Sequence, residues 1–301
     1  MATKPKEQER ETSVIRAPHD GSEVGVVSLA GPADVRAALD ANVQAARACR
    51  ELPAYARANA LRKIADGLQA ARADFARTLA LEAGKPIAQA RTEIDRAIFV
   101  FSDGAEEATR IPGEVLPADA VPAGTGRIAI TRRFPLSPIA AITPFNFPVL
   151  LAAHKIAPAM ACGATITLKP PPQDPLTTLR LGELVKASGY PDGGVNLVPC
   201  HVEVAQILIE DPRVRLITFT GSAKAGWAIR AKAGTKRVAL ELGGNAAAIV
   251  EPTPTLRGPR RAARLAASPT PVSPAFRRSA STSTNLCIRH FSTPLLDGFS
   301  S

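Results

Sequence analysis

Residues 138–250 constrain the fold more than any other part of the chain, because short apolar runs alternate there with segments of helical periodicity. Runs of four or five residues suit buried strands and are too short for most helices. Strands that alternate with helices form parallel βαβ units, whose sheet is covered on both faces. We therefore predict an α/β fold with a doubly wound parallel sheet. The expected strands are 139–143, 164–168, 195–198, 216–219 and 246–250, and the expected helices are 149–162, 177–188, 202–210 and 224–233.

Helices should precede this sheet. Between residues 31 and 110, apolar side chains recur at steps of three and four, most regularly over 33–50 and 56–76. Prolines and glycines between residues 112 and 124 then break the pattern, and residues 127–132 alternate as a short exposed strand does. Residues 1–30 are predicted to be a polar lead-in with one short apolar run, 24–30.

The net charge of +10 raises the question of nucleic-acid binding. Residues 252–301 hold seven arginines and one acid, a net charge of +6, so the preceding 251 residues carry only +4. These residues show no basic stripe with interleaved aromatic side chains, which is the usual footprint of a nucleic-acid interface. We therefore expect no nucleic-acid partner.

Targeting signals and metal-binding patterns are also missing from the sequence. The first ten residues are polar and charged, and no apolar stretch approaches the roughly 20 residues of a membrane helix. Cys49, Cys162, Cys200 and Cys287 have neither metal-ligand spacing nor a dense disulfide pattern, which fits a reducing compartment. The expectation is a soluble cytoplasmic protein without a metal or a membrane partner.

Ligands of open α/β sheets bind at the carboxyl ends of the strands, so the residues after each apolar run are the candidates for chemistry. Asn146 follows the first run, where its carboxamide could stabilise an oxyanion or satisfy a turn. Lys169 follows the second run and could contact a ribose or lie in solvent. Gly221 and Ser222 follow the fourth run, where they could bind a pyrophosphate at a helix N-terminus or where Ser222 could simply be a helix N-cap. Glu241 could be a general base or an ordinary exposed acid.

The order of these motifs is more specific than any one of them. Phe-Asn-Phe-Pro at 145–148, Leu-Lys-Pro at 168–170, Phe-Thr-Gly-Ser at 219–222 and Glu-Leu-Gly-Gly at 241–244 together resemble the aldehyde dehydrogenase superfamily. The resemblance extends upstream to Glu-Ala-Gly-Lys-Pro at 82–86 and covers roughly residues 30–252. It implies that this region is the cofactor-binding domain of such an enzyme.

The resemblance also implies roles for individual residues. Asn146 would be the side-chain donor of the oxyanion hole, and Glu241 the base that activates the deacylating water. Lys169 would contact the adenosine ribose, Ser222 the pyrophosphate, and Leu242, through its backbone, the nicotinamide end. The remaining cofactor contacts expected from the resemblance are Ile142, Thr143, Pro144, Phe145, Gly221 and Gly243.

In this family a cysteine thiolate attacks a small aldehyde, a hydride passes to NAD or NADP, and water hydrolyses the thioester. Full-length relatives are expected to be homo-oligomers. Two positions depart from the family pattern. Pro172 stands where many relatives carry an acid that holds the ribose hydroxyls, so NADP is not excluded. Cys200 replaces a usual glycine, and Cys162 and Cys200 both precede Glu241, which argues against either being the nucleophile.

The sequence beyond Pro252 does not continue the family pattern. That pattern requires an acidic D-A-D turn and then a loop with the nucleophilic cysteine. If one nucleotide were lost at codon 253, the neighbouring reading frame permits D-A-D-L for residues 253–256. The same frame permits F-A-Y-A-G-Q-S-C-I-S-A-Q-R-I-Y-V-H-E for 268–285, with its cysteine at the position of Ala275. We infer that residues 253–301 are an out-of-frame, disordered tail.

The predicted organisation is therefore a lead-in over 1–30, a cofactor-binding domain over 31–252 and the tail over 253–301, with the catalytic domain missing. The chain as written should be inactive as a dehydrogenase. Two alternatives remain from other classes of protein. One is a non-catalytic nucleotide-binding fragment, and the other is an interaction protein that uses the basic tail.

Overall fold

The computed structural model describes residues 11–244. Its sheet contains β5 (Ile139–Ile142), β6 (Ile166–Lys169), β7 (Val195–Leu197), β8 (Leu216–Gly221) and β9 (Arg237–Leu242). The strand order is β7-β6-β5-β8-β9, and β5 pairs in parallel register with both β6 and β8. β5 and β6 are almost wholly buried, as expected of strands covered on both faces. The connecting helices are α5 (Pro148–Cys162), α6 (Leu176–Ala187), α7 (Val202–Glu210) and α8 (Ala223–Lys232).

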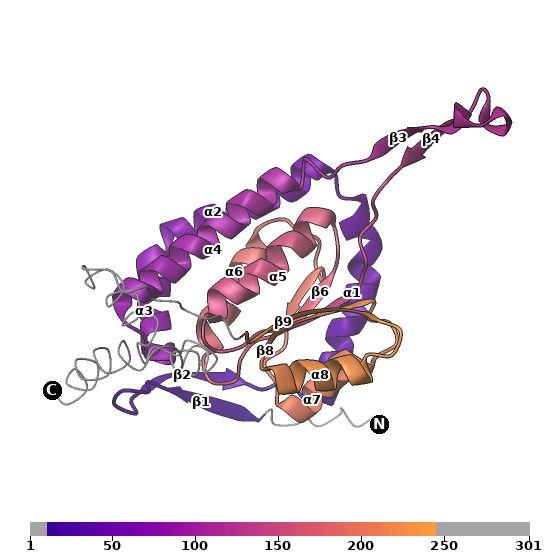
Figure 1. The fold of residues 1–301 in the computed structure, drawn as a ribbon. Helices are drawn as coiled ribbons and strands as arrows, with labels where there is room; N and C mark the ends of the chain where they lie inside the picture. The colour runs from indigo at the N-terminus through magenta and orange to yellow at the C-terminus, as the bar shows by residue number, and fades with distance from the viewer. Residues whose placement is uncertain (1–10, 245–301) are drawn as a thin grey trace, which may run out of the picture. The chain divides into compact units, whose positions relative to one another are not determined.

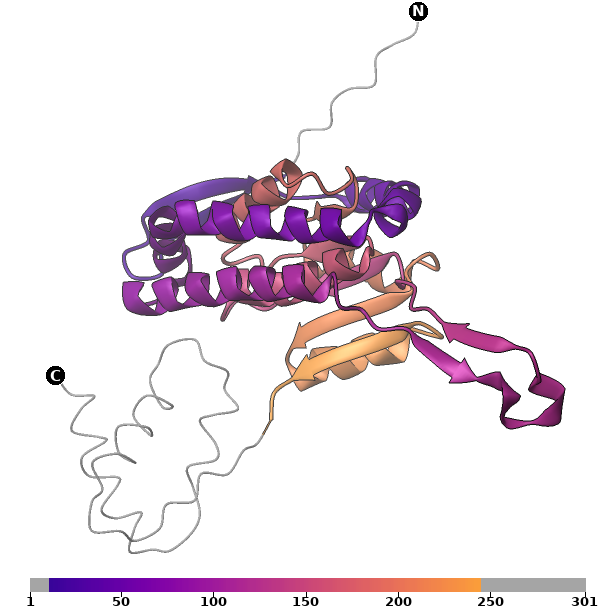
Figure 2. The same cartoon turned by 90° about the horizontal axis from the view of Figure 1, so that it is seen from above.

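A layer of helices precedes the sheet. It consists of α1 (Pro32–Glu51), α2 (Ala54–Ala70), α3 (Arg72–Ala83) and α4 (Ile87–Glu107). The helices α2, α3 and α4 pack over α5 and α6, while α1 lies beside α7 (Figures 1 and 2). The prediction of an α/β fold with a parallel sheet preceded by helices is confirmed. The helix expected over 56–76 is instead two helices, which meet at Ala71.

Gly84 ends α3 in the left-handed region, with φ of 61°. A side chain is strained in this conformation, and a Cβ atom at this position would lie 3.1 Å from the ring of Pro18. Gly84 thus lets the chain turn from α3 into α4 against the N-terminal segment.

Two antiparallel hairpins flank these layers. β1 (Thr12–Arg16) pairs with β2 (Glu23–Ser28), so part of the segment predicted as a lead-in is regular structure. β3 (Glu114–Pro117) pairs with β4 (Ile128–Thr131), and the two short 3-10 turns η1 (Ala118–Ala120) and η2 (Pro122–Gly124) join them. This second hairpin extends away from the helices (Figures 1 and 2). The strand expected over 246–250 and the tail over 253–301 lie outside the described residues.

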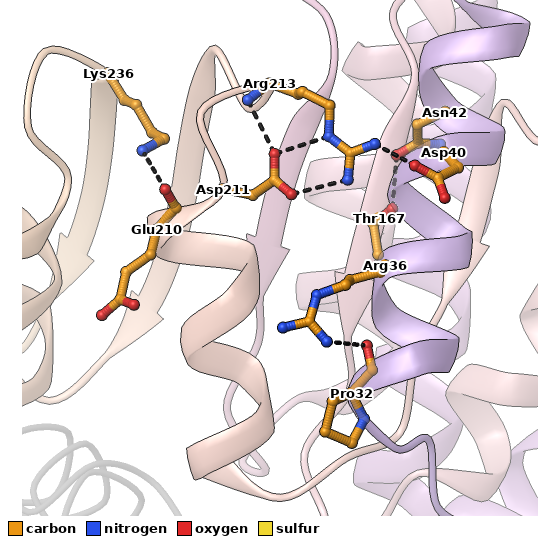
Figure 3. Close-up of polar contacts among 9 residues, drawn as sticks. All are labelled: Pro32, Arg36, Asp40, Asn42, Thr167, Glu210, Asp211, Arg213 and Lys236. Carbon is orange, nitrogen blue, oxygen red and sulfur yellow. Dashed lines mark hydrogen bonds and ion pairs between the residues drawn. The ribbon is translucent and has the colours of Figure 1, made fainter.

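A buried polar contact ties α1 to the sheet. The amide nitrogen of Asn42 donates to the carbonyl oxygen of Gly193 at 2.7 Å, and its oxygen accepts from the hydroxyl of Thr167 at 2.6 Å. Near the same helix, the guanidinium of Arg213 pairs with both Asp211 and Asp40 (Figure 3). These contacts fix α1 against β6 and against the loop that leads into β8. In the part of the chain that the structure describes, no helix is long and apolar enough to cross a membrane.

Candidate functional site

The carboxyl ends of β5, β6 and β8 meet at the middle of the sheet. Ile142, the last residue of β5, is in register with Lys169 of β6 and with Phe219 of β8. Because β6 leads on to β7 on one side of β5, while β8 leads on to β9 on the other, this is the point where the strand order reverses. Ligands of such sheets bind in the crevice at this reversal. The fold therefore brings the residues after β5, β6 and β8 to one edge.

The turn after β5 is anchored to β6. The backbone N–H of Thr143 donates to the carbonyl oxygen of Lys169 at 3.3 Å, and Thr143 itself is buried. Phe145, by contrast, is 44% exposed. The side-chain oxygen of Asn146 is buried and has no hydrogen-bond partner among residues 11–244. The alternative in which Asn146 serves to satisfy a turn therefore has no hydrogen bond to support it.

Two buried charged side chains hold this turn from the helical layer. The Nζ atom of Lys85 lies 2.5 Å from Oε2 of Glu93, and it donates to the carbonyl oxygen of Asn146 at 2.9 Å. The other carboxylate oxygen of Glu93 accepts from the N–H groups of Val149 and Leu150, at the start of α5. The motif at 82–86 drew attention to this region only through the family resemblance, and the spacing of Glu93 gave no separate signal.

Lys169 lies at the end of β6 and is only 4% exposed. Burial lowers the pKa of its ammonium, and the nearby Cys200 opposes this shift. Burial raises the pKa of the Cys200 thiol to about 11, so this thiol remains protonated at neutral pH. Within residues 11–244 no group accepts a hydrogen bond from the ammonium of Lys169. A cation in this position can donate to ligand hydroxyls, whereas its burial does not fit the alternative in which Lys169 lies in solvent.

Gly221 and Ser222 join β8 to α8. Ser222 is the N-cap residue, and its hydroxyl accepts from the N–H of Ala225 at 3.3 Å. The N-cap alternative for Ser222 is thus present in the structure, and it leaves the other free N–H groups of the first turn available. The space beside Gly221 is filled from within the chain, because a Cβ atom there would lie 2.5 Å from the ring of Phe219.

The described part of the site also includes Lys155, which the sequence analysis did not select. It lies on α5, is 7% exposed, and donates to the hydroxyl of Thr218 at 2.9 Å. Burial lowers the pKa of Lys155 to about 8, and the negative charge of Glu241 works in the opposite direction. A lone lysine inside the apolar segment 149–162 was the signal that could have revealed it. Glu241 itself is exposed, near the end of β9, where Leu242 is the last residue and Gly243 follows.

A groove of about 720 Å³ runs between α4 and α5. Its lining is largely apolar and includes Phe99, Val100 and Leu150, with His154 and Arg96 among the polar members. Burial and the charge of Arg96 both lower the pKa of His154. Among the described residues, no cluster of three potential metal ligands occurs.

A profile of the aldehyde dehydrogenase family matches residues 5–257. The chain is 42% identical to a 3-sulfolactaldehyde dehydrogenase of Priestia aryabhattai, over 65% of this chain and 41% of the relative. It is 39% identical to aldehyde dehydrogenase 21 of Physcomitrella patens, solved with the product succinate, with a TM-score of 0.78 over 81% of this chain and 51% of the other.

A third similar protein is the glyceraldehyde-3-phosphate dehydrogenase of Methanocaldococcus jannaschii, solved with NADP. It is 36% identical, with a TM-score of 0.73 over 78% of this chain and 51% of the other. The chain thus spans about half the length of the relatives that it matches.

Proposed function

The chain belongs to the aldehyde dehydrogenase family, and from this premise we propose that residues 31–252 are the cofactor-binding part of an enzyme that oxidises a small aldehyde to an acid with NAD or NADP. One observation carries this proposal more than the others: Asn146 lies at the reversal of the strand order, and its buried side-chain oxygen has no hydrogen-bond partner among residues 11–244, so no contact within the described structure fixes its amide. An amide held without a partner at this place is available to a ligand.

We propose that Asn146 donates its side-chain N–H to the oxygen of the aldehyde carbonyl. When a nucleophile adds to the carbonyl carbon, this oxygen gains negative charge, and a fixed donor stabilises the transition state more than the ground state. The amide belongs to a turn that is tied to β6 and to the connection between α3 and α4, so little reorganisation is required when the charge develops.

Glu241 is proposed to be the general base of the hydrolytic step. It takes a proton from water, whose oxygen then attacks the acyl carbon. Lys155 supports this assignment because its amine is close enough to Glu241 for the carboxylate charge to favour the ammonium form. The hydrogen bond from Lys155 to Thr218 fixes the amine against β8. Lys155 thus places a positive charge near Glu241.

The nucleotide would lie across the carboxyl ends of β5, β6 and β8. Lys169 would donate to the ribose hydroxyls, while the N–H groups around Ser222 would receive the pyrophosphate at the positive end of α8. Ile142, Thr143, Pro144, Phe145, Gly221, Leu242 and Gly243 are the other proposed contacts. The nicotinamide supplies the acceptor for a hydride. Pro172 stands where many relatives carry an acid, so no carboxylate at this position would repel a 2′-phosphate.

We propose that the reading frame changes at codon 253 and that the nucleophilic cysteine is thereby lost. The 301-residue chain would then lack dehydrogenase turnover. The end of the family match at residue 257 supports this proposal. The second candidate function is a nucleotide-binding fragment without catalysis, and the same observation favours it. Under both proposals the chain binds nucleotide.

Titration of the 301-residue chain with NADPH and NADH, followed by nucleotide fluorescence, tests the shared part of the proposals. We expect saturable binding that Lys169→Met weakens and that the exposed control Lys186→Met does not affect. Restoration of one base at codon 253 should then add NAD(P)-dependent oxidation of an aldehyde. If the 301-residue chain binds neither NADPH nor NADH, the proposed function is contradicted.

A further inference from the structure

The side chain of Asn146 has no hydrogen bond of its own among the described residues, so its direction depends on the backbone that carries it. From the contacts of that backbone we infer that Lys85 and Glu93 form a positioning pair, which fixes the turn at Asn146 and thereby aims its amide. This inference rests on the proposed role of Asn146, and it assigns a function to two residues that the proposed mechanism does not use.

The pair holds the turn at both of its ends. On the strand side, Lys85 Nζ donates to the main-chain oxygen of Asn146 at 2.9 Å and lies 4.9 Å from the ring centre of Phe147. On the helix side, Glu93 Oε1 accepts from the N–H groups of Val149 and Leu150, at 3.0 and 3.2 Å. The 2.5 Å contact between Lys85 Nζ and Glu93 Oε2 joins these two points into one unit.

The burial of the pair argues for a positional role. The side chain of Lys85 is 3% exposed and that of Glu93 is fully buried. Burying two charges costs desolvation energy that their attraction does not reliably exceed, so such a pair is weak grounds for a stability role. Its hydrogen bonds to the rest of the chain, however, all end on the backbone of residues 146–150. A buried pair that is hydrogen-bonded at both ends of this segment restricts it to one conformation.

Helix capping alone is the competing explanation. Glu93 satisfies two N–H groups that the first turn of α5 would otherwise leave free. Capping does not require Lys85, and it does not require a contact with Asn146. The two explanations therefore differ in what removal of the lysine should do while the carboxylate stays in place.

The test compares Lys85→Met with Arg72→Met in the 301-residue chain. Arg72, the first residue of α3, pairs at 2.5 Å with Asp95 on the exposed side of α4, so it is an ion pair to the same helix without contact to the turn. Two measurements are made. One is the NMR signal of the Asn146 side-chain NH₂ group, assigned with Asn146→Ala, and the other is amide hydrogen exchange of residues 143–150.

We expect Lys85→Met to shift or broaden the Asn146 signal and to speed exchange within 143–150 on the order of tenfold, while β6 and β7 keep their wild-type exchange. Arg72→Met should change neither readout. Should Lys85→Met fail to fold, Glu93→Gln decides the matter. Its amide oxygen still caps α5, but the charge opposite Lys85 is gone, so the Asn146 signal should again move.

An unchanged Asn146 signal in both variants would overturn the inference, as would faster exchange spread evenly over the sheet. Neither readout depends on aldehyde turnover. If Asn146→Ala costs no rate in a frame-restored enzyme while Lys85→Met still releases the turn, the proposed function fails and the positioning pair stands.

Discussion

Two buried carboxyl groups, Glu82 and Asp174, lie near the positioning pair and set a pH dependence at the scale of single residues. Glu82 accepts hydrogen bonds from the N–H groups of Leu176 and Thr177 at 2.7 and 2.9 Å, which caps α6. Burial raises the pKa of Glu82 to about 7. Burial, together with the charge of Glu82, raises the pKa of Asp174 to about 9, and one oxygen of Asp174 has no partner among residues 11–244.

These shifts predict that the protein loses stability as the pH rises. A carboxyl group whose pKa is raised by folding binds more protons in the folded state, so its contribution is full below pH 4 and declines up to the folded pKa. Between pH 5 and 9 the urea midpoint of unfolding should therefore fall. Asp174→Asn should flatten this decline, whereas Asp95→Asn, on an exposed side chain, should leave it unchanged. Parallel profiles for all three proteins would contradict the assignment.

The proposed catalytic residues give a prediction of a different kind, for the frame-restored enzyme. Glu241→Gln should retain a burst of NAD(P)H and then turn over slowly, because the base acts on water after acylation. Asn146→Ala should slow the burst itself, on the order of 10²–10³-fold, since it removes an oxyanion donor. Stopped-flow absorbance separates the two phases. Loss of the burst in Glu241→Gln would show that the carboxylate acts earlier.

At the scale of elements, the connection between α3 and α4 places Lys85 against the turn at Asn146. Gly84 makes this possible, since its left-handed backbone ends α3 one residue before Lys85. Gly234 has nearly the same φ, 59° against 61°, but its surroundings are open, whereas a Cβ atom on Gly84 would meet Pro18. A comparison of substitutions at Gly84 and Gly234 therefore separates the cost of backbone strain from the cost of local crowding.

Gly84→Ala should destabilise the protein more than Gly234→Ala. Both substitutions force an alanine into the left-handed region, at roughly 1–2 kcal/mol. Only Gly84→Ala adds a crowded contact, which typically costs another 1–3 kcal/mol, roughly. Urea unfolding of the two variants at one pH measures the difference. Equal losses would mean that the hairpin bearing Pro18 yields without cost.

At the scale of the whole molecule, the chain covers about half of the length of the relatives it matches, and the family profile ends at residue 257. The nucleotide sequence across codons 245–290 provides the direct test of the frame proposal. We expect one missing base near codon 253, and restoration should yield a cysteine in the codon now read as Ala275. An in-frame gene whose tail recurs in independent isolates would contradict it.

The sequence by itself determined four strands of the sheet, β5 to β8, and the helix that follows each of them. These elements were predictable because apolar runs and helical periods are local patterns, and the ends of α7 agree with the prediction at both residues. β9 was not among the predicted strands, and the strand order came from the tertiary structure. The residues after β5, β6 and β8 were then selected as candidates because the carboxyl ends of parallel strands share one edge of a sheet. What the sequence could not give was the break at Ala71, where two helices of similar periodicity meet.

Only the tertiary structure decided which side chains support the site. Lys85 and Glu93 lie 61 and 56 residues from their partners Asn146 and Val149, and no local pattern connects positions so far apart. In the sequence, Lys155 only interrupts an apolar segment. Folding brings it into hydrogen-bond contact with Thr218, which lies 63 residues later in the chain. Local periodicity thus determines most of the elements, whereas buried polar contacts such as those of Lys85, Glu93 and Lys155 arise from packing between elements, because a buried polar group is stable only with a partner that tertiary packing supplies.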